Sequence, residues 1–442
     1  MAESMLIYGG TVVDPASGVH EARDVLISNG RIDAVEAGIS KERASTHVDA
    51  TGRIVAPGFV DIHTHLREPG GEASETVASG THSAATGGFT TVFCMPNTTP
   101  VNDSPMIVKH IIREAEQAGY ARVLPVAAVT TGMGGERLND YAALLEAGAG
   151  AFSDDGLPVA NAAMMRRAMQ CIAPLDVVIM DHCEDMSLTG PGVIHEGTVS
   201  ARLGLPGIPR LSESVLVARD AALALETGAH LHICHVSNVE SIEAIRHFKA
   251  RGARLTAEVS PHHLTLTDER VRDFDVNAKM KPPLCDETDR IALIEALEDG
   301  TIDIIATDHA PHAPAKKETT IDQSPFGILG FETAFAVLHR EFVATGRWTL
   351  DFLIERLTVG PARIVGGSWG TLRPGSSADL AIIDPASDWT YSEADIRSRS
   401  RNSPWLGESF MARVVQTVFE GRIVHDVAHQ SSDPVVSGAS GR

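Results

Sequence analysis

Imidazole and carboxylate side chains recur in this sequence directly after short apolar runs. His63 and His65 follow one such run as a His-Thr-His pair, and Asp308 follows another. In an extended chain, residues two apart point the same way, so His63 and His65 can face one ion while Thr64 faces elsewhere. The pair alone is weak support for a metal site, because ordinary surface or core histidines can have the same spacing.

Three further apolar runs end in groups of the same kind. Asp154 and Asp155 follow one run, His182 the next and His235 a third, and a random scatter of 19 histidines would not produce this concentration. Imidazole and carboxylate without thiolate suit Zn²⁺ in a catalytic site, although Mn²⁺ or Co²⁺ could use the same ligands. About six ligands exceed the needs of one tetrahedral ion, so the pattern predicts two ions that activate water and polarise a carbonyl.

Eight apolar segments of strand length must position these groups. They span residues 58–62, 90–95, 123–129, 150–153, 177–181, 230–235, 254–259 and 302–307. Longer amphipathic stretches separate them, such as 212–226 before Gly228 and 239–249 before Gly252. The alternation predicts an α/β protein with a (β/α)8 barrel of the TIM type, whose chemistry lies at the C-terminal ends of the strands.

Both ends of the chain have a different pattern, with short alternating segments broken by turns. Asn29-Gly30 between apolar runs is a hairpin signal, and similar segments return at 378–383 and 414–424. We expect residues 1–57 and 365–430 to form a small β-sandwich domain beside a barrel domain of residues 58–364. Residues 431–442 are rich in Ser, Gly and Pro, and we expect them to form a disordered tail.

Composition excludes several classes of function. The 442 residues are 43% hydrophobic, enough for a substantial core, and the net charge of -21 disfavours nucleic acid and anionic lipid as partners. Five scattered cysteines without a C-x-x-C pair indicate buried thiols in a reducing cytoplasm. The N-terminus has no signal-peptide pattern, and no apolar run reaches ~18 residues. We therefore expect a cytoplasmic enzyme without a membrane span.

Three motifs resemble the amidohydrolase superfamily, and the resemblance extends over essentially the whole chain. Residues 58–70 (GFVDIHTHLREPG) look like the first-strand signature of its dihydroorotase, hydantoinase and allantoinase branch. Residues 306–312 (ATDHAPH) resemble its eighth-strand motif, and 372–384 (LRPGSSADLAIID) are similar to its return segment. The resemblance implies a binuclear metal site, most simply two Zn²⁺ per chain, with ligands His63, His65, Asp155, His182, His235 and Asp308.

The position after the fourth strand discriminates within this branch. Hydantoinases and allantoinases bridge their metals with a carbamylated lysine there, but this chain has no lysine between Lys109 and Lys249. Residues 152–156 (FSDDG) are instead similar to bacterial class I dihydroorotases, in which an aspartate is a metal ligand. The spacing to His182 in that family favours Asp155, and Asp154 stays open as the alternative.

A pocket for a carboxylated ring is the second implication of the resemblance. An acidic protein repels a small anion at long range, so its pocket needs local cations, and Arg67 is placed to hold a carboxylate bidentately. An arginine here could equally be a surface ion-pair former, and an asparagine beside proline a turn residue. The substrate-binding residues that the family implies are Arg67, Asn97 and His312 for the carboxylate, and Asn277 with backbone near Phe326 and Gly327 for the ring.

The polar stretch 313–324 after the eighth strand contains Lys316 and Lys317. It is either a solvated loop or a lid that excludes water on closure.

The implied reaction is the reversible hydrolysis of the cyclic amide of dihydroorotate to N-carbamoyl-aspartate, in pyrimidine biosynthesis. Asp308 would act as general base and then deliver the proton to the departing nitrogen. One alternative is a related hydrolase of hydantoin, allantoin or a dihydropyrimidine. Another is a non-catalytic scaffold for aspartate carbamoyltransferase. We expect a homodimer, and association of an active enzyme with that transferase stays open.

Overall fold

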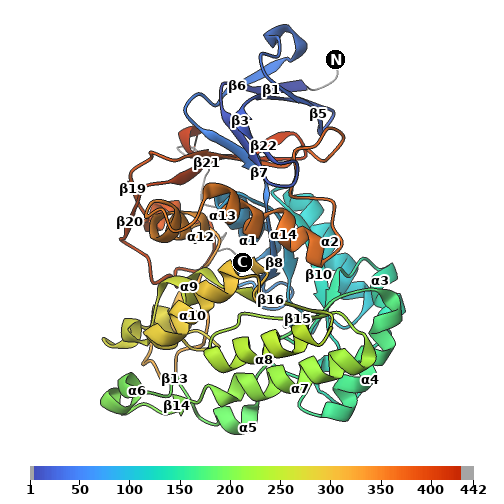
Figure 1. Ribbon diagram of the computed structural model, residues 1–442, viewed down its shortest axis with the longest axis vertical. Helices are drawn as coiled ribbons and strands as arrows, with labels where there is room; N and C mark the ends of the chain where they lie inside the picture. Colours follow the sequence, from blue (N-terminus) through green and yellow to red (C-terminus); the bar gives the residue numbers. More distant parts are fainter. Residues whose placement is uncertain (1–3, 430–442) are drawn as a thin grey trace, which may run out of the picture.

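Eight parallel strands form the central sheet of the computed structural model, which describes residues 4–429 (Figure 1). Their spatial order is β17-β16-β15-β12-β11-β10-β9-β8. The strands are β8 (Phe59–Thr64), β9 (Phe89–Cys94), β10 (Arg122–Ala127), β11 (Ala151–Phe152), β12 (Ile179–Asp181), β15 (Leu231–Ile233), β16 (Leu255–Val259) and β17 (Ile304–Ile305). Each predicted strand segment overlaps one of them, which confirms the predicted α/β class and strand count.

The sheet closes through the chain that follows its last strand. Thr64 of β8 bridges His309 in parallel, and the His65 N–H donates to the His309 carbonyl at 2.8 Å. The first and eighth strand regions are thereby joined, so the sheet forms a nearly complete barrel. Strands β8 and β9 are buried on both faces, which explains their almost continuous apolar runs.

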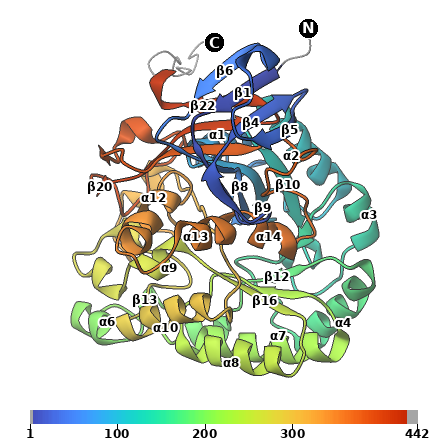
Figure 2. The same ribbon diagram turned by 45° about the horizontal axis from the view of Figure 1, so that its top comes forward.

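Helices surround the barrel (Figure 2). They are α1 (Val77–Thr86), α2 (Pro105–Ala118), α3 (Tyr141–Glu146), α4 (Ala162–Ile172), α5 (Met186–Thr189), α6 (Thr198–Leu203), α7 (Leu211–Thr227), α8 (Val239–Ala250), α9 (Pro261–Thr265), α10 (Glu287–Glu298), α11 (Pro314–Lys317), α12 (Ala334–Leu338), α13 (Leu350–Leu357) and α14 (Val359–Ile364). Helix α7 ends at Gly228, whose φ of 72° is left-handed, as the sequence predicts. Asn238 caps α8 by accepting the Ser241 N–H.

The chain ends build two further sheets above the barrel (Figure 1). One has the order β5-β4-β1-β6 and the other β22-β21-β18-β7-β2-β3. Their strands are β1 (Ser4–Tyr8), β2 (Thr11–Asp14), β3 (Val19–Ala22), β4 (Asp24–Ser28), β5 (Arg31–Glu36), β6 (Thr46–Asp49), β7 (Ile54–Pro57), β18 (Leu380–Asp384), β21 (Arg413–Phe419) and β22 (Arg422–Asp426). Two short ribbons complete the strands, β13 (Ile194–His195) with β14 (Gly207–Ile208) and β19 (Trp389–Thr390) with β20 (Ser409–Phe410).

Distant parts of the sequence pair in these terminal sheets. Strand β7 runs antiparallel to β18, and buried side chains such as Ile7, Val55 and Ile382 from both sheets share one core. The predicted hairpin at Asn29-Gly30 joins β4 to β5, with φ of 52° and 73° at its two turn residues. The expected pairing of the two chain ends is therefore confirmed.

Two further expectations concern the ends of the chain and the membrane. The tail predicted at residues 431–442 lies outside the described residues. Across residues 4–429, none of the helices combines the length and apolar character needed to cross a bilayer.

Candidate metal centre

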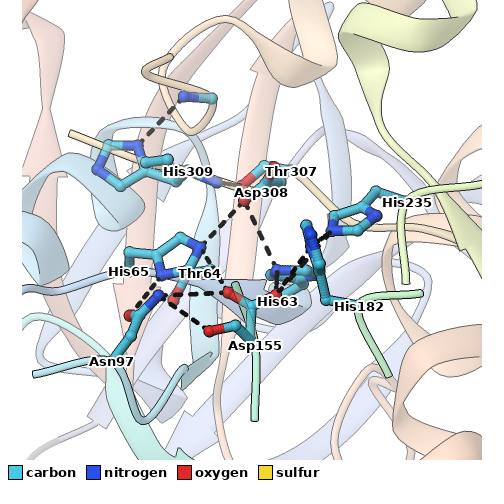
Figure 3. A network of polar contacts seen from close by, with 12 residues as sticks. His63, Thr64, His65, Asn97, Asp155, His182, His235, Thr307, Asp308 and His309 are labelled. Atoms are coloured by element: carbon cyan, nitrogen blue, oxygen red, sulfur yellow. Dashed lines mark hydrogen bonds and ion pairs between the residues drawn. The ribbon is translucent and has the colours of Figure 1, made fainter. Parts of the chain in front are cut away.

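The predicted ligand groups converge at the carboxyl end of the barrel (Figure 3). They come from the ends of five strands or from the residues directly after these ends. His63 lies in β8 and His65 follows it, Asp155 follows β11, His182 follows β12, His235 follows β15, and Asp308 follows β17. Six side chains that span almost 250 positions of sequence are brought together because parallel strands end at one face of the barrel.

Asp155 lies between two pairs of histidines (Figure 3). Its Oδ1 is 3.4 Å from His63 Nε2 and 3.6 Å from His182 Nδ1, while its Oδ2 is 3.5 Å from His65 Nε2. His235 Nε2 lies 4.0 Å from Oδ1. Since both carboxylate oxygens face imidazole nitrogens, this side chain can serve two ligand groups at once.

Asp308 completes the group around the first histidine pair. Its Oδ1 is 3.1 Å from His65 Nε2 and 3.6 Å from His63 Nε2. Asp308 and His235 both have left-handed backbone conformations, with φ of 48° and 32°. Non-glycine residues rarely adopt this region, and such strain clusters where a site must aim particular side chains.

Several buried polar atoms of this cluster lack any hydrogen-bond partner among the described residues. They are His63 Nε2, Asp155 Oδ1 and His235 Nδ1. An unsatisfied buried polar atom costs about 1–3 kcal/mol, so native proteins rarely leave several together without a purpose. His63, Asp155 and His235 offer ligand atoms within 4.8 Å of one another, as do His63, His65 and Asp308. These residues therefore fit one or more metal ions, with nitrogen and oxygen donors of the kind that zinc accepts.

The electrostatics of the cluster favour a cation. Burial opposes ionisation of Asp155, but the positively charged His63 imidazole 3.4 Å away holds the pKa of this carboxyl well below its usual range. Burial likewise opposes ionisation of Asp308, and the charge of His63 outweighs it and lowers the pKa. Burial, with the charge of His182, lowers the pKa of His235 to about 3. Ionised carboxylates and neutral imidazoles are the states in which these groups bind metals. His235 is already neutral, whereas burial opposes protonation of His63 but the charge of Glu258 outweighs it and raises the pKa of His63, so a metal would have to displace that proton.

Glu258 orients His63 from behind. Its Oε1 is 2.5 Å from His63 Nδ1 and its Oε2 is 2.9 Å from His232 Nε2. A carboxylate on one ring nitrogen fixes the tautomer and leaves the other nitrogen for the metal. The sequence-based prediction missed Glu258, although a fully buried glutamate inside the apolar strand β16 is a usable signal.

Asp154 faces away from the histidines. Its Oδ1 accepts the Thr130 N–H at 3.1 Å, and its Oδ2 accepts the Thr130 hydroxyl. Burial raises the pKa of Asp154 to about 6. Of the two adjacent aspartates, Asp155 is therefore the one placed among the imidazoles.

A cavity of about 170 Å³ opens beside the ligand cluster. Lining residues predicted from the sequence are Arg67, Asn97, His312, Phe326 and Gly327, together with five of the six predicted ligands, His65, Asp155, His182, His235 and Asp308. The cavity also contains Lys281, a cation that the sequence-based prediction missed. Asn277 is not part of the lining and lies in a 3-10 turn (Val276–Ala278).

Protein contacts already hold the polar groups of this cavity. The Arg67 Nε donates to the Pro311 carbonyl at 3.2 Å, and His312 Nε2 lies 2.6 Å from the Phe326 carbonyl. Asn97 Oδ1 is 3.0 Å from His65 Nδ1, so this amide also orients a predicted metal ligand. Its signal in the sequence, an asparagine at the end of the second strand, does not distinguish the two roles.

The loop after the eighth strand is anchored by a buried lysine. Lys317 is only 6% exposed, and its Nζ donates to the carbonyls of Val276 at 2.9 Å and Pro325 at 2.8 Å. Lys316, its neighbour in α11, is exposed. Of the two alternatives for this stretch, a solvated loop does not describe Lys317, because this side chain turns inward to bind backbone oxygens.

Three comparisons with known proteins agree with this geometry. A dihydro-orotase-like family model matches residues 52–241. The chain is 48% identical to a dihydroorotase of Pelotomaculum thermopropionicum, over 95% of this chain and 98% of that protein. It is 46% identical to a dihydroorotase of Syntrophus aciditrophicus, over 95% of this chain and 99% of that protein.

Solved structures share the architecture. The L-hydantoinase (dihydropyrimidinase) of Arthrobacter aurescens superimposes with a TM-score of 0.86 at 26% identity, over 96% of each chain. A D-hydantoinase of Thermus sp. gives 0.81 at 23% identity over 96% of this chain and 95% of that chain, a likeness of fold alone. The barrel with its terminal sheets is thus a known arrangement. Sequence identity, rather than the fold, distinguishes among the families that share it. By its identity to full-length relatives, the chain belongs to the dihydroorotase family.

Proposed function

We propose that this chain is a zinc-dependent dihydroorotase of the bacterial class I type. It would reversibly hydrolyse the cyclic amide of dihydroorotate to N-carbamoyl-aspartate, the third step of de novo pyrimidine biosynthesis. The observation that carries the proposal is the place of Asp155 between two histidine pairs, in a stretch of chain without lysine. A carboxylate there replaces the carbamylated lysine that hydantoinases and allantoinases are expected to use.

Two zinc ions per chain are the simplest occupants of the ligand cluster. His63, His65 and Asp308 would hold one, His182 and His235 the other, and Asp155 would contact both. Bound zinc would supply an activated water and polarise the amide carbonyl. Glu258 would keep His63 in the tautomer that presents Nε2 to the ion.

Arg67, Asn97 and His312 are the proposed partners of the substrate carboxylate. The Arg67 guanidinium is fixed by the Pro311 carbonyl through Nε, which leaves its terminal nitrogens for a bidentate contact. Lys281 lines the same cavity as a second cation, with its Nζ held 2.9 Å from Glu184 Oε1. Asn277 and the backbone of Phe326 and Gly327 would meet the ring, with Asn277 reaching it only if its turn moves toward the cavity.

Asp308 is the proposed proton carrier. Because its pKa is lowered, its carboxylate is ionised before reaction and can accept the proton of the attacking water. The water oxygen bonds to the ring carbonyl carbon, and the carbon-nitrogen bond of the ring then breaks. Asp308 returns the proton to the departing nitrogen, so one water is consumed and the carboxylate is regenerated.

The proposal also includes the domain boundaries of the protein, its oligomeric state and its cellular compartment. A sandwich domain of residues 1–57 plus 365–430 and a barrel domain of 58–364 agree with the end of β7 at Pro57 and of α14 at Ile364. The five cysteines are all free, which supports a reducing cytoplasm, although Cys171 is exposed and only the other four are buried as expected. A homodimer, and association with aspartate carbamoyltransferase, are proposed from the family resemblance.

The deciding experiment assays the purified protein on dihydroorotate and hydantoin side by side, with metal analysis of the same sample. We expect turnover of dihydroorotate and about two zinc ions per chain. Activity on hydantoin alone would overturn the substrate assignment. Absence of metal together with absence of both activities would favour the scaffold.

A further inference from the structure

A second large cavity lies at the opposite end of the barrel, between the barrel and the terminal sheets. Its volume is about 950 Å³, and its walls come from the β4–β5 and β21–β22 turns, the start of β10 and the segment after α14. We call it the arginine cleft after its main lining side chains. These are Arg31, Arg122, Arg373 and Arg422, with Trp369 and Glu420.

Three of the four guanidinium groups have no carboxylate partner. Arg122 is neutralised by Asp379 and Glu420, each at 3.0 Å. Within residues 4–429, the other three arginines of the cleft form no ion pair. Three uncompensated positive charges in one concavity repel one another, and they do so on a protein of net charge -21. Water solvates these exposed guanidinium groups in the free protein, and an anion in the cleft would compensate all three of them.

The cleft is held rigid by backbone contacts rather than left to mobile loops. The Ile32 N–H donates to the Ser376 carbonyl at 3.0 Å, and the Gly375 N–H donates back to Ile32 at 2.8 Å. The two hairpin turns also touch, since a Cβ on Gly421 would lie 2.9 Å from the Gly30 Cα. This close packing fixes the backbone that carries the cleft arginines, so little ordering is needed on binding.

Two of the unpaired arginines are also oriented by carbonyl groups. The Arg31 Nη1 donates to the Gly375 carbonyl at 2.8 Å, and the Arg373 Nη2 donates to the Ala16 carbonyl. Each of these contacts uses one of the five N–H donors of a guanidinium and leaves the others for a ligand. Anchored arginines with free donors are suited to phosphate oxygens, which they bind in pairs.

Trp369 adds an aromatic surface to the same cavity. Its ring packs edge-on against Phe93, with 6.4 Å between ring centroids, and the Arg122 guanidinium carbon lies over the ring at 5.7 Å from its centroid. The side chain is half-buried and lines the cleft. A base stacked on an aromatic ring gains about 1–3 kcal/mol in nucleic-acid complexes, and a mononucleotide would make the same contact with the part of the Trp369 ring that Arg122 leaves exposed. The cavity volume also lies in the range of small-molecule sites, about 300–1,000 Å³.

We propose that the arginine cleft binds a nucleoside triphosphate, with its phosphates on Arg31, Arg373 and Arg422 and its base on Trp369. The site is separate from the catalytic cavity, because Arg122 opens strand β10 whereas the metal ligands follow the opposite strand ends. The proposal does not depend on the substrate of the metal centre. Nucleotide binding in the arginine cleft would be a property additional to the hydrolysis of a small cyclic amide.

Titration calorimetry of the full-length protein with ATP, UTP and inorganic tripolyphosphate tests the proposal. We expect saturable binding of both nucleotides, reduced at least about tenfold in the double variant Arg373→Ala/Arg422→Ala. Trp369→Leu should weaken the nucleotides by about tenfold but leave tripolyphosphate unchanged, since it removes only the stacking surface. Thermal unfolding of each variant verifies that it folds.

Two controls separate the cleft from other sites on the protein. Arg246→Ala removes an exposed arginine of α8 that pairs with Asp299, and it should bind nucleotide as the parent does. Asp308→Asn alters the metal centre and should also bind normally. The proposal is overturned by absence of saturable nucleotide binding, by equal binding to the double arginine variant, or by loss of binding in Asp308→Asn.

Discussion

The two ends of the barrel gather charged side chains in opposite ways. At the carboxyl end, the six predicted ligands are between 0 and 7% exposed, and five of them line a cavity of about 170 Å³. At the amino end, exposed arginines on surface turns line a cleft of about 950 Å³. The first arrangement removes charge from water, whereas the second leaves it solvated until a ligand arrives.

This difference in the burial of charge determines which substitutions each end of the barrel can tolerate. Buried charges lose several kcal/mol of hydration and need close partners. Removal of one member therefore leaves the others buried without a compensating charge. Exposed charges interact weakly, typically by less than about 1 kcal/mol, and each can be replaced without loss of the fold. Chemistry that requires fixed distances therefore belongs at the carboxyl end, and reversible recognition of a solvated anion suits the amino end.

Substitution of Asp308 should have the largest effect at the carboxyl end. In Asp308→Asn the amide retains an oxygen near His65 but cannot take up a proton, so we expect kcat on dihydroorotate to fall by about 10²- to 10⁴-fold. Metal content should remain near that of the parent. Steady-state kinetics and elemental analysis of one preparation measure both quantities.

Near-normal turnover in Asp308→Asn would remove this carboxylate from the role of base. The cleft at the other end offers the matched control, because Arg422→Ala also removes a charge but lies outside the catalytic cavity. Its kcat should match that of the parent.

A smaller difference in activity and metal content is expected between variants of the two adjacent aspartates after β11, Asp154 and Asp155. Asp155→Asn weakens the negative charge shared by four imidazoles, so we expect loss of bound metal and a fall in activity of about 10²-fold. Asp154→Asn is the matched control, because its amide can still accept the Thr130 N–H and lies away from the histidines. Elemental analysis after dialysis distinguishes them, and equal metal loss from both variants would contradict the assignment of Asp155.

Sequence alone could predict the carboxyl end because topology does most of the positioning there. Once eight parallel strands are recognised, His63, His182, His235 and Asp308 must meet, since the ends of the strands meet. The choice between Asp154 and Asp155 depended on family resemblance, because rotation of a two-residue turn decides which carboxylate faces inward.

The residues that escaped prediction are positioned by tertiary contacts. Glu258 lies in the middle of a strand, and its role depends on which barrel face its side chain occupies. Lys281 reaches the cavity from a long connection without periodic structure. The arginine cleft unites turns near residues 30, 375 and 421, and no local pattern predicts that they touch. The fold was therefore predictable from periodicity, whereas side-chain direction across long separations was not.

The smallest predicted effect compares a buried and an exposed lysine within α11. Burial, reinforced by the charge of Lys279, lowers the pKa of Lys317 to about 7, whereas an unfolded lysine titrates near about 10.4. Between these values the unfolded chain holds a proton that the folded chain lacks, so the Lys317 contribution to the free energy of unfolding becomes more favourable as pH rises. Relative to Lys317→Met, the parent should gain up to about 2 kcal/mol between about pH 7 and pH 9.

Urea unfolding of the parent, Lys317→Met and Lys316→Met across this pH range measures that gain. Lys316 is exposed and its substitution should leave a difference from the parent that does not change with pH. A flat difference for Lys317→Met as well would mean that its ammonium stays protonated, held by the carbonyls of Val276 and Pro325. The loop beside the catalytic cavity would then be anchored by a buried charge. The contrast between buried charge at the carboxyl end of the barrel and solvated charge at the amino end would then rest on the metal ligands alone.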